Sequence, residues 1–154
     1  MTAADDAPLA PQPALASWRR RAVAVTVDAV VLAFVVLVTL LLAGVRAEQI
    51  DRTIREGEPI VMLLLFIAPR AVYDTVFIGS RSQTPGKRWL GIKVVDAGDA
   101  SPIGYSRAFG RWVSTAAFWA LFTVPGIVDH LWPLRDRRNQ TLHDKVVRSL
   151  VVRA

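Results

Sequence analysis

A carboxylate interrupts a long apolar segment near the start of the chain. Residues 22–45 contain a single charged residue, Asp28, and Arg21 directly precedes them. The seven-residue step from Arg21 to Asp28 is almost two helical turns, so both side chains project from one helix face, about 10 Å apart along the axis. They are too far apart to pair directly. A partner from elsewhere in the chain must therefore bridge them.

A second pair of charges lies in the next apolar segment, residues 60–79. Arg70 and Asp74 are spaced i, i+4 and can pair on one helix. Their expected depth in the membrane matches that of Asp28, so the sequence predicts a buried cluster in which Arg70 bridges both carboxylates. A charged side chain at mid-membrane costs about 2.5–3.5 kcal/mol and commonly marks an ion or proton path. The alternative is a staple between helices that holds no ligand.

The C-terminal third of the chain adds three polar candidates, of which Asp129 and His130 are the weaker ones. Asp129 and His130 follow the Pro125-Gly126 break, and histidine can relay protons near neutral pH. The alternative for them is a satisfied pair at the membrane interface. Asp144 can cap a helix and fix the C-terminal strand. Its expected partners are Arg135, Arg137 and Arg138.

Composition excludes several kinds of function. The chain has no cysteine, which excludes disulfides, thiolate metal sites and thiol catalysis. The polar segments hold neither a nucleophile–histidine–acid set nor metal-ligand spacing, so we expect no enzyme activity, metal or cofactor. The net charge is +6. The basic residues flank the apolar segments, and stacking aromatic side chains are not interleaved with them. This pattern favours contact with anionic lipid headgroups over binding of nucleic acid.

The apolar segments predict the elements that carry these residues. The chain has 154 residues, 53% of them hydrophobic, and residues 18–154 are expected to form one membrane domain behind a disordered tail, 1–17. Residues 22–45 and 60–79 are long enough to cross a hydrocarbon core of about 30 Å, and Pro69 predicts a kink in the second span. Residues 112–134 form a third membrane segment. Strand-like residues near 89–96 and 146–152 can pair as a small β-ribbon.

The distribution of charge predicts the topology. The 46–59 connection carries three basic and four acidic residues, whereas 80–111 and 135–154 each carry six basic residues. The positive-inside rule then places both termini and residues 80–111 in the cytoplasm of a bacterial cell. Residues 112–134 must return as a helical hairpin turning at Pro125-Gly126, with three plain spans as the alternative. We therefore predict an α-helical integral membrane protein of the plasma membrane, with two full transmembrane helices, this third segment and a cytoplasmic β-ribbon.

Three blocks of sequence carry a family resemblance. RRAVAVTVD, QTPGKRWLGIKVVDAGDASPIGYSRAFGRW and DRRNQTLHDKVVRSLVV together resemble the RDD family of small bacterial membrane proteins, which is named for one arginine and two aspartates. Residue by residue, the resemblance assigns that motif to Arg21, Asp28 and Asp144. The segment after Asp144 is bulkier than the family pattern. The resemblance implies a multi-pass membrane protein, with transport of an unidentified ligand as its suggested role.

Two functions agree with these features. The first is a transport or cation/proton-exchange module, which we expect to be a homo-oligomer or part of a larger membrane complex, because two or three helices cannot enclose a pathway alone. The second is an accessory or assembly subunit of a membrane complex, without chemistry of its own.

Overall fold

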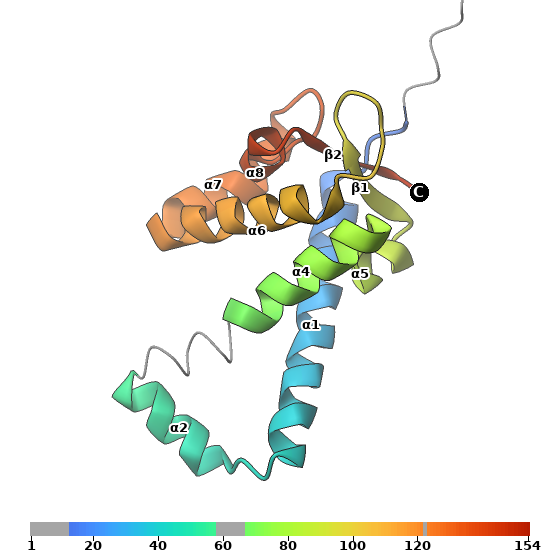
Figure 1. Ribbon diagram of the computed structural model, residues 1–154. Helices are drawn as coiled ribbons and strands as arrows, with labels where there is room; N and C mark the ends of the chain where they lie inside the picture. Colours follow the sequence, from blue (N-terminus) through green and yellow to red (C-terminus); the bar gives the residue numbers. More distant parts are fainter. Residues whose placement is uncertain (1–12, 58–66, 122) are drawn as a thin grey trace, which may run out of the picture.

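The first element of the protein is a long apolar helix. The computed structural model describes residues 13–57, 67–121 and 123–154, which are mostly helical (Figure 1). Helix α1 (Trp18–Leu42) has 25 residues and is about 37 Å long at the usual rise per residue. Its distal half exposes large apolar side chains, such as Phe34 at 65% and Leu42 at 84%. Within the described ranges, α1 is the one helix long and apolar enough to cross a membrane.

The second predicted span is described only in its C-terminal half. Residues 58–66 lie outside the described part, so the prediction of a full span over 60–79 is not tested there. The mixed-charge connection before it contains helix α2 (Ala47–Glu56), which ends at the left-handed Gly57. Helix α4 (Ala68–Arg81) follows. Pro69 lies in the first turn of α4, where a missing backbone N–H costs no intrahelical hydrogen bond.

The predicted β-ribbon is present. Strands β1 (Ile92–Asp96) and β2 (Ser149–Arg153) pair antiparallel, with Ile92 opposite Arg153 and Asp96 opposite Ser149. The short helix α5 (Pro85–Trp89) leads into β1. The ribbon pairs segments that are more than fifty residues apart in the sequence. It lies beside the N-terminal end of α1, called the base of α1 below (Figure 1).

The chain before α1 also joins this ribbon. Ala16 N donates to the Val151 carbonyl at 2.9 Å, and Arg153 N donates to the Ala14 carbonyl at 2.8 Å. Leu15 forms a bridge to Val152. The predicted disordered tail is therefore wrong for residues 14–16, because their backbone groups find partners on the free edge of β2. Residues 1–12 lie outside the described part.

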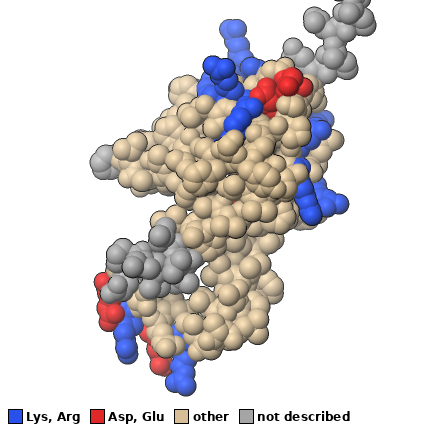
Figure 2. Space-filling view, viewed as in Figure 1, with Lys and Arg blue, Asp and Glu red and all other residues tan. Residues whose placement is uncertain are grey.

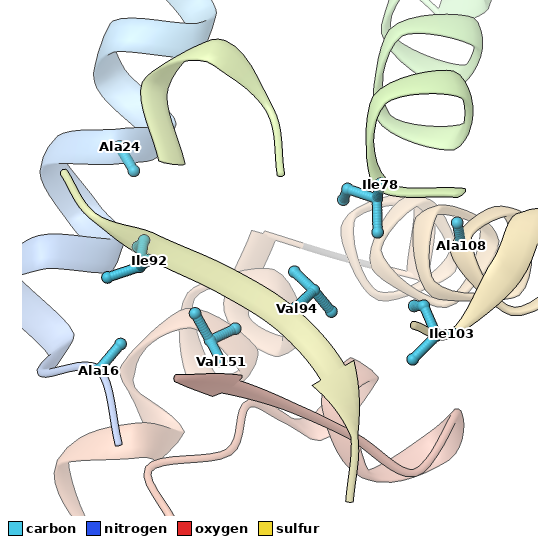
Figure 3. Close-up of a cluster of buried hydrophobic side chains, with 8 residues drawn as sticks. All are labelled: Ala16, Ala24, Ile78, Ile92, Val94, Ile103, Ala108 and Val151. Atoms are coloured by element: carbon cyan, nitrogen blue, oxygen red, sulfur yellow. The ribbon is translucent and has the colours of Figure 1, made fainter. Parts of the chain in front are cut away.

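A small apolar core lies between the ribbon and the helices. Its side chains come from the base of α1, from α4, from both strands and from the segment that follows β1 (Figure 3). They are small or β-branched, which lets backbone segments pack closely. The members are Ala16, Ala24, Ile78, Ile92, Val94, Ile103, Ala108 and Val151. This core anchors α1 at its N-terminal end.

The C-terminal region forms the predicted helical hairpin, with different boundaries. Helix α6 (Gly104–Leu121) and helix α7 (Thr123–Leu131) lie side by side and run crosswise to α1 (Figure 1). The first helix thus begins eight residues before the predicted start at residue 112. A turn of 3₁₀ helix, η2 (Trp132–Leu134), and the short helix α8 (Leu142–Val146) then lead to β2.

The hairpin does not turn at Pro125-Gly126, as the sequence had suggested. Helix α6 extends to Leu121 and α7 begins at Thr123, so both predicted turn residues lie inside α7. Proline is tolerated there because the first helical turn needs no donor from it. Gly126 permits close packing of the two helices, since a Cβ at this position would lie 2.5 Å from the nearest atom of the Trp119 ring. Its lack of a side chain lets the two helices approach.

Candidate functional site

Asp144 is fully buried between two arginines. Arg21 Nη1 donates to Asp144 Oδ2 at 2.7 Å, and Arg111 Nε donates to Oδ1 at 2.9 Å. Thr141 positions the carboxylate through a capping box at the start of α8. Burial alone would raise the pKa of Asp144, but the charges of Arg111 and Arg21 and the hydrogen bond from Arg21 hold it well below its ordinary value. The group is a carboxylate held between two fixed cations.

The arginines that contact Asp144 are not those predicted from sequence. Arg135, Arg137 and Arg138 were expected as donors, yet the donors come from α1 and α6. Arg138 instead donates to the Ala97 carbonyl at 2.7 Å. The predicted roles of Asp144 as a helix cap and as an anchor for the last strand are both present, since Ser149 Oγ at the start of β2 donates to Asp144 Oδ1 at 3.1 Å.

Asp28 is held by a different set of groups. Its carboxylate accepts hydrogen bonds from Thr84 Oγ1 at 2.5 Å, Gly86 N at 2.7 Å and the Tyr73 hydroxyl at 2.8 Å. Lys87 Nζ lies 3.9 Å away. The carboxylate is fully buried. The Thr84–Lys87 segment therefore docks onto α1 through Asp28.

The predicted bridge from Arg70 to Asp28 is wrong. Arg70 Nε pairs with Asp74 Oδ2 at 2.7 Å, as the i, i+4 spacing indicated, but no ion pair joins it to Asp28 among the described residues. Nor does any one group bridge Arg21 and Asp28. The real partners of Asp28 lie mainly in the Thr-Pro-Gly-Lys segment, to which sequence reasoning assigned no role. Its polar side chains and free backbone N–H groups were the available signal.

Gly86 permits this docking. A Cβ at position 86 would contact the Ala24 carbonyl of α1 and lie 2.8 Å from Asp28 Oδ1. Backbone atoms cannot move aside as a flexible side chain can, so any larger residue must push the segment away from α1.

We expect Gly86→Ala to lower the free energy of unfolding by about 1–3 kcal/mol because of this overpacking. Gly110→Ala is the matched control, since its Cβ would meet Val147 at an ordinary 3.5 Å in the middle of α6. That variant should be neutral or slightly more stable. Unfolding followed by circular dichroism in mild detergent measures both. Equal stability of the two variants would contradict close docking at Gly86.

Asp129 pairs mainly with a histidine that the sequence did not single out. His143 donates to Asp129 from its backbone N at 2.9 Å, and its ring Nδ1 lies 2.6 Å from Asp129 Oδ2. The predicted partner, His130, is 3.4 Å from Asp129, and its Nδ1 lies 3.0 Å from the Gly126 carbonyl. The contact between Asp129 and its sequence neighbour His130 is thus secondary to the contact between Asp129 and His143.

His143 extends the charged network toward Arg111. Arg111 Nη2 lies 3.0 Å from His143 Nε2. Burial lowers the pKa of His143, and the charge of Arg111 lowers it further, against the opposing effects of Asp129 and Asp144. A neutral ring fits the geometry, with Nδ1–H donating to Asp129 and Nε2 accepting from Arg111. Buried polar contacts thus run continuously from Asp129 through His143 and Arg111 to Asp144 and Arg21.

A cavity of about 280 Å³ lies between the base of α1 and helices α4, α5, α6 and α7. Its wall includes four basic side chains and a single carboxylate, which are Arg21, Arg70, Lys87, Arg111 and Asp74. Both histidines, Trp18 and Thr115 also line it. Tertiary structure therefore collects cations from four separate segments around one space.

A comparison with known protein families covers the part of the chain that contains these residues. The model of the RDD family matches residues 15–148, a range that contains Arg21, Asp28 and Asp144. No curated protein and no solved structure matches the chain. The match and the exposed apolar helix α1 together indicate a membrane location. The chain belongs to the RDD family.

Proposed function

We propose that this protein is a membrane transport module whose solute site is the basic cavity at the base of α1. The observation that carries the proposal is the cavity itself, which has charged walls and lies directly beside an exposed apolar helix. Charged groups beside a membrane segment are costly, and they characteristically line solute paths. A mostly apolar lining with a few converging charged groups is typical of small-molecule sites.

The distribution of surface charge supports the proposal that the part of the molecule between its two charged ends is embedded in the membrane. Figure 2 shows Lys and Arg at the end that carries the ribbon and again around α2, with an uncharged belt between them. The ribbon end and both termini are placed in the cytoplasm by the positive-inside rule. The α6–α7 hairpin, which runs crosswise to α1 (Figure 1), would then lie along the cytoplasmic membrane surface and return the chain without crossing.

The cavity is a better ligand site than Asp28. Sequence reasoning had placed a proton or sodium site at that carboxylate. Its two oxygens already accept three hydrogen bonds of 2.5–2.8 Å, which leaves little capacity to coordinate a cation. Solute movement is therefore assigned to the cavity. One chain has too few spans to enclose a pathway, so we also propose a homo-oligomer or a larger membrane complex.

A flux experiment tests this proposal. The purified protein is reconstituted in liposomes, and proton, sodium, labelled phosphate and labelled succinate fluxes are each compared with those of protein-free vesicles. We expect at least one flux to exceed the background, and Thr115→Trp to reduce it about tenfold or more by filling the cavity. Val113→Trp is the matched control on the same helix, because Val113 is exposed and lies outside the cavity wall.

If folded protein accelerates none of the four fluxes, the transport proposal fails, and the role of accessory or assembly subunit takes its place. Equal flux in the two tryptophan variants would likewise remove the cavity from the path.

A further inference from the structure

We infer that the cavity binds a small oxyanion, with a phosphate or carboxylate group, through Lys87, Arg70 and Arg111. This inference rests on the proposed function only in using the same cavity, and it concerns binding rather than movement. Lys87 is its central residue.

The ammonium group of Lys87 is poorly satisfied by the protein. The residue is only 6% exposed, so water cannot fully solvate it. An ammonium carries three donors, yet its one hydrogen bond among the described residues is a long contact of 3.4 Å to Thr84 Oγ1. The nearest carboxylate oxygen, on Asp28, is 3.9 Å away and already accepts from Thr84. A buried ammonium in this state needs a further acceptor, which the cavity can admit.

The two neighbouring arginines, Arg70 and Arg111, also have N–H donors that bind no acceptor within the described residues. Arg70 uses Nε for Asp74, and no hydrogen bond from its terminal nitrogens is found within the described ranges. Arg111 uses Nε and Nη2, and its Nη1 has no acceptor in the same part of the chain. Guanidinium groups with free parallel N–H donors favour carboxylate and phosphate oxygens, which they can bind in bidentate fashion.

The charge balance around the cavity also favours the binding of an anion. Four basic side chains line it, and they contact three carboxylates, because Arg21 and Arg111 share Asp144. The other two carboxylates are Asp28 and Asp74. A fourth buried carboxylate, Asp129, lies off the cavity wall and is bonded to His143. The wall therefore presents more cations than anions, which attracts an anion and repels a metal cation.

The volume limits the size of the ligand. A space of about 280 Å³ lies at the lower end of the range for small-ligand sites, about 300–1,000 Å³. Inorganic phosphate or a short dicarboxylate fits such a space with some of its water. A lipid phosphate could enter only as a headgroup from the adjoining membrane surface.

Binding should weaken as the pH rises. Burial lowers the pKa of Lys87 to about 8, and the charge of Arg111 adds to this effect. Above that pH the cavity loses one positive charge, while its arginines stay charged, so affinity should fall as the pH passes through about 8. The other charged or titratable groups that face the cavity or Lys87 are Arg21, Arg70, Arg111, Asp28, Asp74, His130 and His143.

The test measures binding to the full chain in a neutral detergent. Inorganic phosphate and succinate are titrated at pH 7 and pH 9, with calorimetry and thermal stability as readouts. We expect saturable binding of at least one anion at pH 7, weaker binding at pH 9, and an affinity roughly tenfold or more lower in Lys87→Gln, because a charged hydrogen-bonding partner is lost. Lys93→Gln is the matched control, since Lys93 lies in β1 away from the cavity.

A second arm distinguishes a free solute from a lipid headgroup. The protein is placed in nanodiscs of phosphatidylcholine alone or with phosphatidylglycerol, and its thermal stability is compared. Stabilisation by phosphatidylglycerol that Lys87→Gln removes identifies the headgroup as the source. If Lys87→Gln does not fold, Arg70→Gln replaces it in both arms, because Arg70 also lines the cavity.

Two results would overturn the inference. One is the absence of any response to phosphate, succinate and phosphatidylglycerol by folded wild-type protein. The other is an equal response in the cavity variant and in Lys93→Gln. The outcome is separate from that for transport, because binding without flux refutes only transport, and sodium or proton flux without oxyanion binding refutes only the anion site.

Discussion

Asp144→Asn is expected to lower the free energy of unfolding by about 3–5 kcal/mol, because it removes the one carboxylate between two buried arginines. Arg21 and Arg111 both donate to this group, and the side chains of all three are at most about one-eighth exposed. Asparagine keeps the shape but cancels the charge, so neither guanidinium retains its anionic partner. Unfolding by sodium dodecyl sulfate, titrated from a mild detergent and followed by circular dichroism, measures the change.

The effect of Asp144→Asn should depend on pH in a defined direction. The pKa of Asp144 in the folded protein lies well below the ordinary value of 3.8, so the unfolded chain binds a proton more readily than the folded one. The stabilisation by Asp144 is therefore complete above about pH 4 to 5, and it is lost as the pH falls toward the folded pKa. The gap between wild type and variant should narrow in that acidic range.

Asp51→Asn provides the matched control for this experiment. Asp51 forms an i, i+4 ion pair with Arg55 on α2, and both side chains are more than half exposed. Such pairs contribute below about 0.5 kcal/mol. If Asp144→Asn cost no more than Asp51→Asn, the buried network would contribute little to the stability of this fold.

Asp28→Asn is expected to lower the free energy of unfolding by about 3 kcal/mol and to release the Thr84–Lys87 segment from α1. Each oxygen of Asp28 accepts from a donor, Oδ2 from Thr84 and Oδ1 from Gly86 and Tyr73. An amide nitrogen in place of Oδ1 would turn a donor toward the Gly86 N–H, and in either orientation the negative charge is lost from a fully buried site. Because the segment contains Lys87 and is followed by Arg88, faster tryptic cleavage there would report its release.

The same variant separates a structural role of Asp28 from a role in ion exchange. For a structural role, the loss of stability should be the same with and without sodium. Asp99→Asn is a control, since Asp99 lies exposed in the turn after β1. A variant with wild-type stability and unchanged proteolysis, but with altered sodium or proton flux, would restore the ion site that the sequence alone suggested.

Local patterns predicted several elements well. An apolar run of 24 residues with one charge specifies a long exposed helix, since its length and hydropathy require no knowledge of its neighbours. The alternation in two short segments, one in the middle of the membrane domain and one at its C-terminal end, predicted the β-ribbon, and their pairing is confirmed. The i, i+4 spacing of Arg70 and Asp74 predicted their ion pair. The hairpin was expected, but Pro125-Gly126 was wrongly taken as its turn, because a proline in the first turn of a helix resembles one in a loop.

The partners of the isolated charges could not be predicted in this way. The sequence by itself determined that Arg21, Asp28 and Asp144 must be compensated, because a buried charge without a partner is too costly. Which groups compensate them was decided by the tertiary structure. Asp28 is bonded by a segment some 56–58 residues downstream and Arg21 by a residue 123 positions away. Periodicity acts within a helix or strand, whereas these contacts arise where separate segments pack around one core, so only the folded chain reveals the cavity that they enclose.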